Sequence, residues 1–360
     1  MKKKALFILM VAVLGSTFWF ASAYKAVPQL VADSYDSLWK RAVSYEKEGL
    51  PESMKSCVDS IFNKAVQEKN TVQQIKAKIF QMKAILTKEN DKNDEVFDEL
   101  EAFASRCESP EAKALVHSLL ADAYFTYFNN DSYTISKRTD MAGVAPDNID
   151  EWSASNFAQR IMLHLKASVE AKDVLAGASL TPWLPLLEEI ENDSSGSLFS
   201  YLNDRLITIS SRCVNSFSKN YKQTVMNDGS YLIPREMFVN LIITDKSELD
   251  FGAMALRSYQ ENLKLYAAQG KKDALLKMDL NRLIRVKAYT QNSIYKALLK
   301  SLIDNNKDCP SVMNAYIELS NNFFFGETAP EEYRQLYDIC KEGALLYPSS
   351  REAIQLRNKI

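Results

Sequence analysis

The sequence contains 360 residues, of which 46% are apolar and 25% are charged, and its formal net charge is −2. This composition is typical of a packed globular protein and excludes an intrinsically disordered chain. The balanced charge, without a basic patch interleaved with aromatic residues, argues against nucleic-acid binding.

The amino terminus has the pattern of a secretory signal peptide. Three lysines follow the first methionine, and residues 5–20 form an apolar run. Ala21 and Ala23 then provide the small residues that signal peptidase requires, so Tyr24 is the expected first residue after cleavage. A retained membrane anchor is the alternative, but polar and small residues interrupt the run. We therefore expect residues 1–23 to be removed and the protein to be periplasmic or associated with the outer surface.

Cleavage would make the mature chain mildly acidic. Residues 1–23 hold three of the 44 basic residues and none of the 46 acidic ones, which leaves a formal charge of −5. No later segment is long and apolar enough to span a membrane, and no cysteine directly follows the apolar run to carry a lipid. No stable membrane span is expected after cleavage.

The rest of the chain has the periodicity of long helices. Apolar residues recur at spacings of three and four, and the chain has only 10 glycines and 10 prolines. The first expected helix, 36–48, ends at Gly49, and Pro51 begins the second. Further helices are expected at 52–70, at 72–89, around 96–104, and from Pro110, Leu198 and Phe251 onward. Loops are expected at 131–149, 181–185, 192–197 and 227–234.

This succession predicts an all-α fold of stacked antiparallel helix pairs, a solenoid similar to tetratricopeptide arrays. Each pair would bury its apolar face against its neighbours. We expect one elongated domain over residues 24–360, or two lobes of about 24–180 and 198–360.

The five cysteines are spread singly along the chain. This spacing excludes short zinc signatures and thioredoxin-like pairs. Cys309 and Cys340 flank an expected helical hairpin, which allows a disulfide between them. Buried free thiols are the alternative for all five.

No residue pattern indicates catalysis. The sequence lacks a glycine-rich phosphate loop and the HExxH and GxSxG motifs. His117 and His164 both lie among apolar residues, where a structural role is expected. The carboxylate pairs 188–189 and 331–332 leave a helical hydrolase as a further hypothesis, although solvated surface charge is the favoured interpretation. We expect no enzymatic activity, no cofactor and no metal site.

Aromatic residues exceed what a single apolar stripe can bury. Trp152, Trp183 and Phe324 are candidates for contacts with a protein partner or a sugar face. Core packing between helices is the alternative role for these aromatic side chains.

Six segments together resemble the amino-terminal helical region of bacterial alpha-2-macroglobulin-like proteins. They are YDSLWK at 35–40, GLPES at 49–53, QIKA at 74–77, HSLLADAY at 117–124, LNDRL at 202–206 and YPSSREA at 347–353. The resemblance implies a tetratricopeptide-like region without the β-sandwich domains that carry the protease bait and the thioester. Protease trapping is therefore not expected from this chain alone.

The function expected from these observations is that of an exported, non-enzymatic interaction module. Its partner would be a protein of the cell envelope. The alternative is a periplasmic or surface glycan-binding protein that uses aromatic platforms.

Overall fold

The computed structural model describes residues 34–88, 93–139, 145–187, 196–323 and 330–360. The chain divides into two compact units, of which the first ends at Asn220 and the second spans Tyr221–Ile360. Residues 1–33 lie outside the described part, and the expected signal peptide and its cleavage residues Ala21, Ala23 and Tyr24 fall among them.

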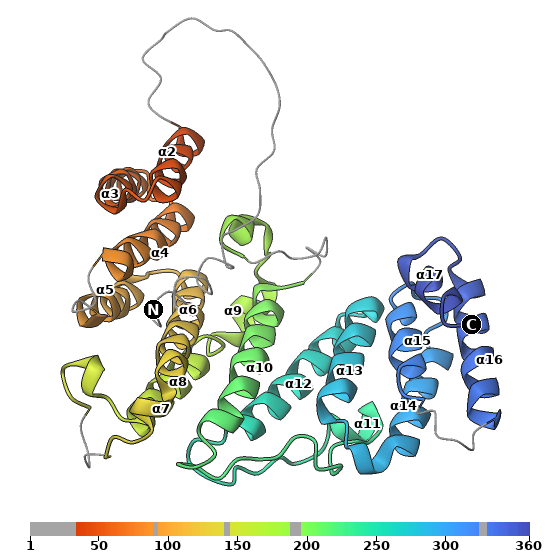
Figure 1. Ribbon diagram of the computed structural model, residues 1–360. Helices are drawn as coiled ribbons and strands as arrows, with labels where there is room; N and C mark the ends of the chain where they lie inside the picture. The colour runs from red at the N-terminus through yellow and green to blue at the C-terminus, as the bar shows by residue number, and fades with distance from the viewer. Residues whose placement is uncertain (1–33, 89–92, 140–144, 188–195, 324–329) are drawn as a thin grey trace, which may run out of the picture. The chain divides into compact units, whose positions relative to one another are not determined.

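The structure confirms the all-α fold. Helices make up most of the described residues, which contain no strand beyond an isolated bridge between Ser179 and Ser197. The first unit contains α2 (Tyr35–Lys47), α3 (Pro51–Gln67), α4 (Thr71–Lys88), α5 (Asn93–Arg106), α6 (Pro110–Asn130), α7 (Ser132–Ile135), η1 (Ile149–Glu151), α8 (Ala154–Ala167), α9 (Lys172–Gly177), η2 (Thr181–Leu186) and α10 (Leu198–Ser216) (Figure 1).

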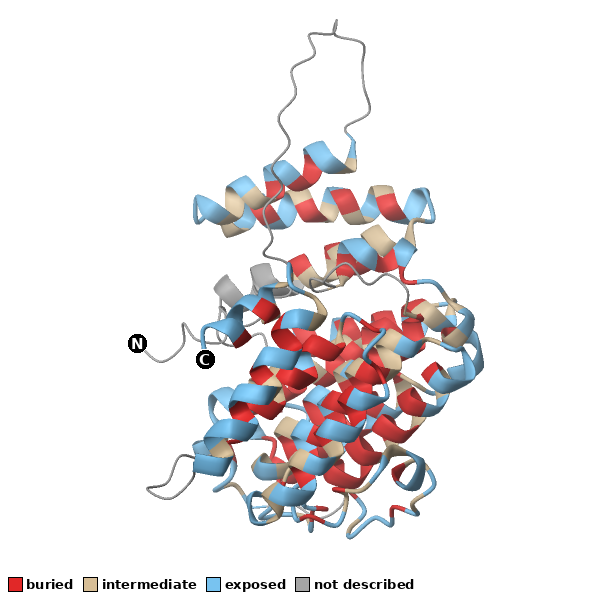
Figure 2. Cartoon of the chain, turned by 90° about the vertical axis from the view of Figure 1, so that its right-hand side faces the viewer, coloured by how far each residue is buried: buried red, intermediate tan, exposed pale blue. Residues whose placement is uncertain are grey.

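The second unit contains α11 (Arg235–Phe238), α12 (Phe251–Ala268), α13 (Lys272–Val286), η3 (Tyr289–Gln291), α14 (Asn292–Asp304), α15 (Val312–Ser320), α16 (Pro330–Leu346) and α17 (Arg351–Arg357). Consecutive helices pack against one another in both units, as in α2 with α3 and α14 with α15. Buried and exposed positions alternate along the helices in the manner of amphipathic helices (Figure 2).

The first helical hairpin follows the sequence prediction closely. Gly49 adopts φ +68° after α2, and Pro51 is the first residue of α3. A core cluster then joins α2, α3 and α4, and its buried members are Leu38, Trp39, Ala42, Met54, Val58, Ile61, Ala77 and Phe80. The turn residues and the apolar spacing of the sequence therefore both predict the hairpin that the structure shows.

Helix α6 differs from the expected amphipathic helix. The sequence predicted helices that bury one apolar face against their neighbours, but α6 packs against α4, α5, α8, α9 and α10 and is buried on most of its circumference. Its buried positions include polar residues such as Ser118 and Thr126. Helix α6 is the centre of the first unit, and its polar side chains lie in contacts between helices.

The boundary between the units lies later than the expected gap between lobes at residues 181–197. Helix α10 packs against α6 and α9 and therefore belongs to the first unit. The proline-rich η2 also belongs to this unit, where it packs against α4. Composition identified a break in helical periodicity, but helix packing decides which unit a segment joins.

In the second unit, a long segment before α12 is fixed by buried side chains. We call residues 221–250 the strap. Asp250 accepts hydrogen bonds from the amide and the hydroxyl of Thr224, at 2.9 and 2.6 Å. Gln223 donates to the carbonyl of Leu249 at 2.9 Å and accepts from the amide of Phe251 at 2.8 Å. These bonds satisfy backbone groups that the loop would otherwise leave unpaired.

A buried charge fixes the middle of the strap. Arg282 on α13 is only 1% exposed and pairs with Asp279 at 2.7 Å. Its guanidinium also donates to the carbonyl oxygens of Tyr231 and Ile233, at 3.3 and 3.0 Å, and lies 4.7 Å from the ring centre of Phe238. The pairing compensates for removing the charge from water and holds the strap against the helices.

No described helix combines the length and the apolar character that a membrane span requires.

Candidate functional site

Two places in the chain bring together side chains that could serve a function. One is a polar cluster around α6 in the first unit. The other is a groove at the carboxyl-terminal helices of the second unit. Neither position is apparent from a sequence motif.

The two histidines of the chain face each other across the contact between α6 and α8. Nδ1 of His117 lies 2.9 Å from Nδ1 of His164, and Nε2 of His164 lies 2.9 Å from Oε1 of Glu101 on α5. Tyr124 donates to the same carboxylate oxygen at 3.0 Å, and Arg160 approaches it at 3.5 Å. Three helices therefore converge on a single carboxylate.

The distance between the histidines restricts their protonation. A hydrogen bond between two Nδ1 atoms requires one atom to carry a proton and the other to accept it. Burial, followed by the neighbouring His164 and Lys113, lowers the pKa of His117 to about 4. His117 is therefore neutral near pH 7, and protonation of both rings would place two N–H groups against each other.

The carboxylate of the cluster stays ionised at neutral pH. Burial acts to raise the pKa of Glu101, but the hydrogen bond from His164, the charge of Arg160 and the hydroxyl of Tyr124 lower it below its usual value. His164 is fully buried and both its nitrogens contact protein atoms. Both nitrogens of His164 are therefore engaged within the protein, and the cluster joins α5, α6 and α8.

Trp152 lies in the core beside this cluster. It is 7% exposed, its ring stacks on Tyr124 with centroids 5.6 Å apart, and its Nε1 donates to the carbonyl of Pro146 at 2.7 Å. Trp183 is likewise buried, at 8% exposure, within η2. Both tryptophans therefore pack inside the first unit and do not form an exposed platform. Phe324, the third candidate aromatic, lies outside the described residues.

Helix α10 packs against another side of α6. Arg205 donates to the hydroxyl of Ser118 at 3.0 Å and to Asp122 at 3.2 Å, and Arg212 approaches Asp122 at 3.4 Å. Ser118 and Asp122 belong to the segment 117–124, and Arg205 belongs to the segment 202–206. Two of the segments that carry the family resemblance therefore contact each other, and these residues have packing roles.

The possible disulfide between Cys309 and Cys340 is not formed in the structure. All five cysteines, Cys309 and Cys340 included, are free. Cys309 lies 3.0 Å from a carboxylate oxygen of Asp273, and burial together with this carboxylate raises the pKa of its thiol to about 11. Cys340 is fully buried, and burial raises its pKa as well. Both are protonated thiols of low reactivity near pH 7.

The carboxylate pairs do not form a site in the described part of the chain. Glu331 is exposed at the start of α16, and Glu332 pairs with Lys296 at 3.7 Å. Residues 188–189 lie outside the described ranges. Within those ranges, no group of three His, Cys, Asp or Glu side chains could hold a metal ion.

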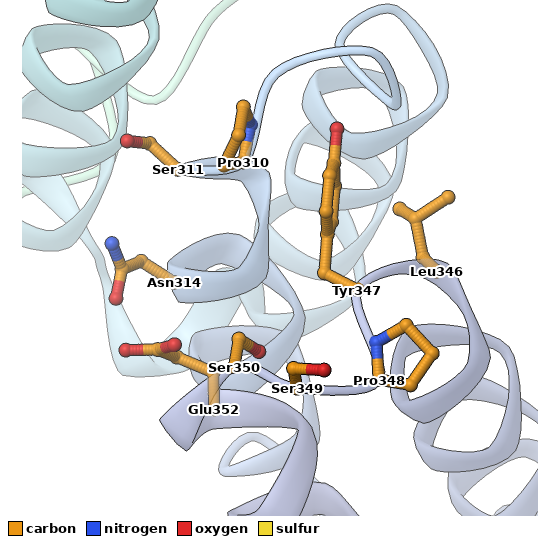
Figure 3. Close-up of a pocket in the computed structure, with 9 residues that line it drawn as sticks. All are labelled: Pro310, Ser311, Asn314, Leu346, Tyr347, Pro348, Ser349, Ser350 and Glu352. Carbon is orange, nitrogen blue, oxygen red and sulfur yellow. The ribbon is translucent and has the colours of Figure 1, made fainter.

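A groove of about 560 Å³ opens where the start of α15 meets the turn between α16 and α17. Figure 3 shows its lining residues, which are Pro310, Ser311, Asn314, Leu346, Tyr347, Pro348, Ser349, Ser350 and Glu352. This volume is within the range of small-molecule and peptide side-chain pockets. Five of the lining residues lie in the segment 347–353, which carries part of the family resemblance, but no sequence pattern indicated that this segment meets the start of α15.

Local structure fixes the walls of the groove. The side chain of Ser350 caps α17 by accepting from the amide of Ala353 at 3.0 Å. The hydroxyl of Tyr347 donates to the carbonyl of Lys307 at 3.0 Å, which fixes the position of its ring. Arg357 donates to the carbonyl of Pro348 at 3.1 Å. The turn is thus held at both ends.

No protein-family model, no curated protein and no solved structure matches this chain. The functional assignment therefore depends on the geometry of the described residues and on the sequence pattern.

Proposed function

We propose that the protein is an exported, non-enzymatic helical-repeat module that binds a polypeptide. The groove between α15 and the α16–α17 turn carries this proposal. It lies at the end of consecutive helical hairpins and presents polar side chains beside an aromatic ring and two prolines. Grooves between helices that combine apolar walls with a few polar groups are suited to extended or side-chain ligands.

Export is supported by the basic, apolar and small-residue succession at residues 1–23. A relationship to the helical region of alpha-2-macroglobulin-like proteins is a separate hypothesis. It rests on short segments, two of which have packing roles in α6 and α10. We do not include protease trapping in the proposed function.

Glycan binding through tryptophan platforms is not favoured. A sugar-binding platform needs an exposed aromatic face, whereas Trp152 and Trp183 are 7% and 8% exposed. The polypeptide proposal uses a different surface and does not depend on either residue.

A site-specific cross-linking experiment tests the proposal. A photoreactive amino acid replaces Ser349 in the full chain, which is expressed in a host that exports it. Asp338, exposed on α16, is the matched control position. We expect a discrete polypeptide adduct at position 349 that is absent at position 338, and a mature amino terminus at Tyr24. Equal or absent adducts at the two positions would show that the groove does not bind a polypeptide.

A further inference from the structure

Consecutive helices of this chain are joined repeatedly by one arrangement, in which a tyrosine and a lysine bind the same glutamate. The hydroxyl of Tyr316 on α15 donates to Oε1 of Glu342 on α16 at 2.9 Å, and Lys307 pairs with this oxygen at 2.6 Å. We call this arrangement a carboxylate clamp, because a hydroxyl and an ammonium group hold one carboxylate. Two further clamps consist of Tyr35, Lys64 and Glu68 at α2 and α3, and of Tyr295, Lys287 and Glu318 at α14 and α15.

Helix α16 carries the same residue types on an exposed surface. Four exposed side chains at four-residue spacing form a single ridge along this helix, which we call the α16 ridge: Tyr333, Tyr337, Lys341 and Leu345. Its three apolar members are, in chain order, 54%, 47% and 69% exposed. The row beside the ridge is buried and consists of Leu336, Cys340 and Ala344. Ridges of this spacing are the surfaces through which helices pack against one another.

The neighbours of α16 contact it on other sides. In Figure 1, α16 stands at the edge of the second unit, beyond α14 and α15. Glu332 pairs with Lys296 of α14 at 3.7 Å, and α17 approaches α16 at Gly343, where an added Cβ would lie 2.6 Å from Leu356. Helix α17 has 7 residues and spans about 10 Å, whereas the 17 residues of α16 span about 25 Å. The first half of the ridge therefore extends beyond the helix that follows it.

The charges of α16 are divided between its sides. At about 100° per residue, Arg334 and Lys341 lie within about 60° of Tyr337 around the helix axis, whereas all acidic residues of α16 lie at about 100° or more. Nζ of Lys341 is 5.7 Å from the ring centre of Tyr337. Among the described residues, neither side chain meets a carboxylate. Tyr337 and Lys341 therefore have the composition of a clamp without its glutamate, on a positively charged side of the helix.

We propose that the α16 ridge binds an amphipathic helix of a polypeptide partner through an acidic side chain of that helix. Apolar side chains of the partner helix pack against the two tyrosines and Leu345, which continues the stacking of consecutive helices in this unit. One carboxylate accepts a hydrogen bond from Tyr337 and pairs with Lys341, as in the clamp around Glu342. None of the ridge residues lines the groove, so this inference goes beyond the proposed function and does not depend on it.

The test measures binding of synthetic helices to the full chain. Each probe is a fluorescent amphipathic helix of about 15 residues, held by a hydrocarbon staple because isolated helices of this length are marginal in water. Leucines form one face, and a central position at the border of this face is glutamate, glutamine or lysine. Fluorescence anisotropy gives the dissociation constants. We expect the glutamate helix to bind about threefold more tightly than the glutamine helix, the range of a partly exposed ion pair, and the lysine helix to bind most weakly.

Three variants locate the binding surface. Lys341→Met removes the charge and keeps an unbranched stem, and Tyr337→Phe removes only the hydroxyl. Each should reduce the preference for the glutamate helix over the glutamine helix toward one. Lys55→Met is the matched control, because it removes an exposed lysine from α3 of the first unit, and it should leave the preference unchanged. Circular dichroism verifies that the variants remain helical.

Each outcome decides one step of the proposal. No measurable binding of the three helices would overturn docking of a helix, and equal binding of the glutamate and glutamine helices would overturn recognition of a carboxylate. A preference that persists in both Lys341→Met and Tyr337→Phe, or that is lost in Lys55→Met as well, would overturn its assignment to the α16 ridge. Cross-linking at position 349 tests the groove alone, so the two proposals can fail separately.

Discussion

Acidification should destabilise the first unit through His117. Burial and the nearby His164 and Lys113 lower the pKa of His117 from 6.5 to about 4 in the folded protein. Between these pH values the unfolded chain binds a proton that the folded chain does not. The stability of the folded state therefore falls as the pH decreases from about 6.5 toward 4, and it is unaffected by this group at higher pH.

The size of the stability loss follows from the difference between the two pKa values of His117. A difference of one pKa unit corresponds to about 1.4 kcal/mol, so the two pKa values imply a loss of about 2 kcal/mol between pH 7 and pH 5. His117 is half-buried, and solvent screening reduces the effect of partly exposed groups. We therefore expect a loss of about 1 kcal/mol over this interval.

Urea denaturation followed by tryptophan fluorescence can measure this loss in the first unit alone. Trp39, Trp152 and Trp183 are the tryptophans beyond residue 23, and the second unit has none. In His117→Asn, an amide can replace the Nδ1 contact but does not titrate. The stability difference between wild type and variant should shrink by about 1 kcal/mol from pH 7 to pH 5. A difference that stays constant would refute the assignment of the pH effect to His117.

Two further predictions concern the strap of the second unit. In Gly252→Ala the new Cβ would lie 2.0 Å from the carbonyl oxygen of Thr224, so the strap must move. We expect the free energy of unfolding to fall by at least about 2 kcal/mol. Urea denaturation followed by far-ultraviolet circular dichroism measures this loss. Gly177→Ala is the control, because no atom lies within 4 Å of its new Cβ, and it should be neutral or stabilising by up to about 1 kcal/mol. Equal losses of unfolding free energy in the two variants would contradict a close approach of the Thr224 carbonyl to Gly252. Arg282→Ala leaves Asp279 buried without its partner and should lower the free energy of unfolding by about 3–5 kcal/mol. A loss below about 1 kcal/mol would mean that Asp279 is solvated.

Much of the helical architecture could be predicted from local signals. Gly49 and Pro51 defined the first turn, and the apolar spacing of Val96, Leu100 and Phe103 defined the buried face of α5. Each of these signals acts within a few residues of the chain. The sequence therefore specifies the helices well, together with the packing of adjacent ones.

The contacts between distant polar residues could not be predicted in this way. His117 and His164 are 47 positions apart, and each lies in an apolar stretch that indicates only burial. Their pairing depends on the packing of α8 against α6, for which the sequence contains no local signal. The same reason explains why the groove was missed, because the start of α15 and the turn that precedes α17 meet only after folding.

The type of a residue does not separate polar groups that join several helices from polar groups at the surface. Glu101 and Glu352 are both glutamates on helices. Glu101 accepts hydrogen bonds from Tyr124 and His164, so its interactions are completed within the protein and hold three helices together. Glu352 has no such partner among the described residues and is half-exposed in the first turn of α17, where solvent and the helix N-terminus stabilise its charge. The same residue type therefore joins three helices at one position and favours the start of a single helix at the other, and only the packing of the folded chain separates the two roles.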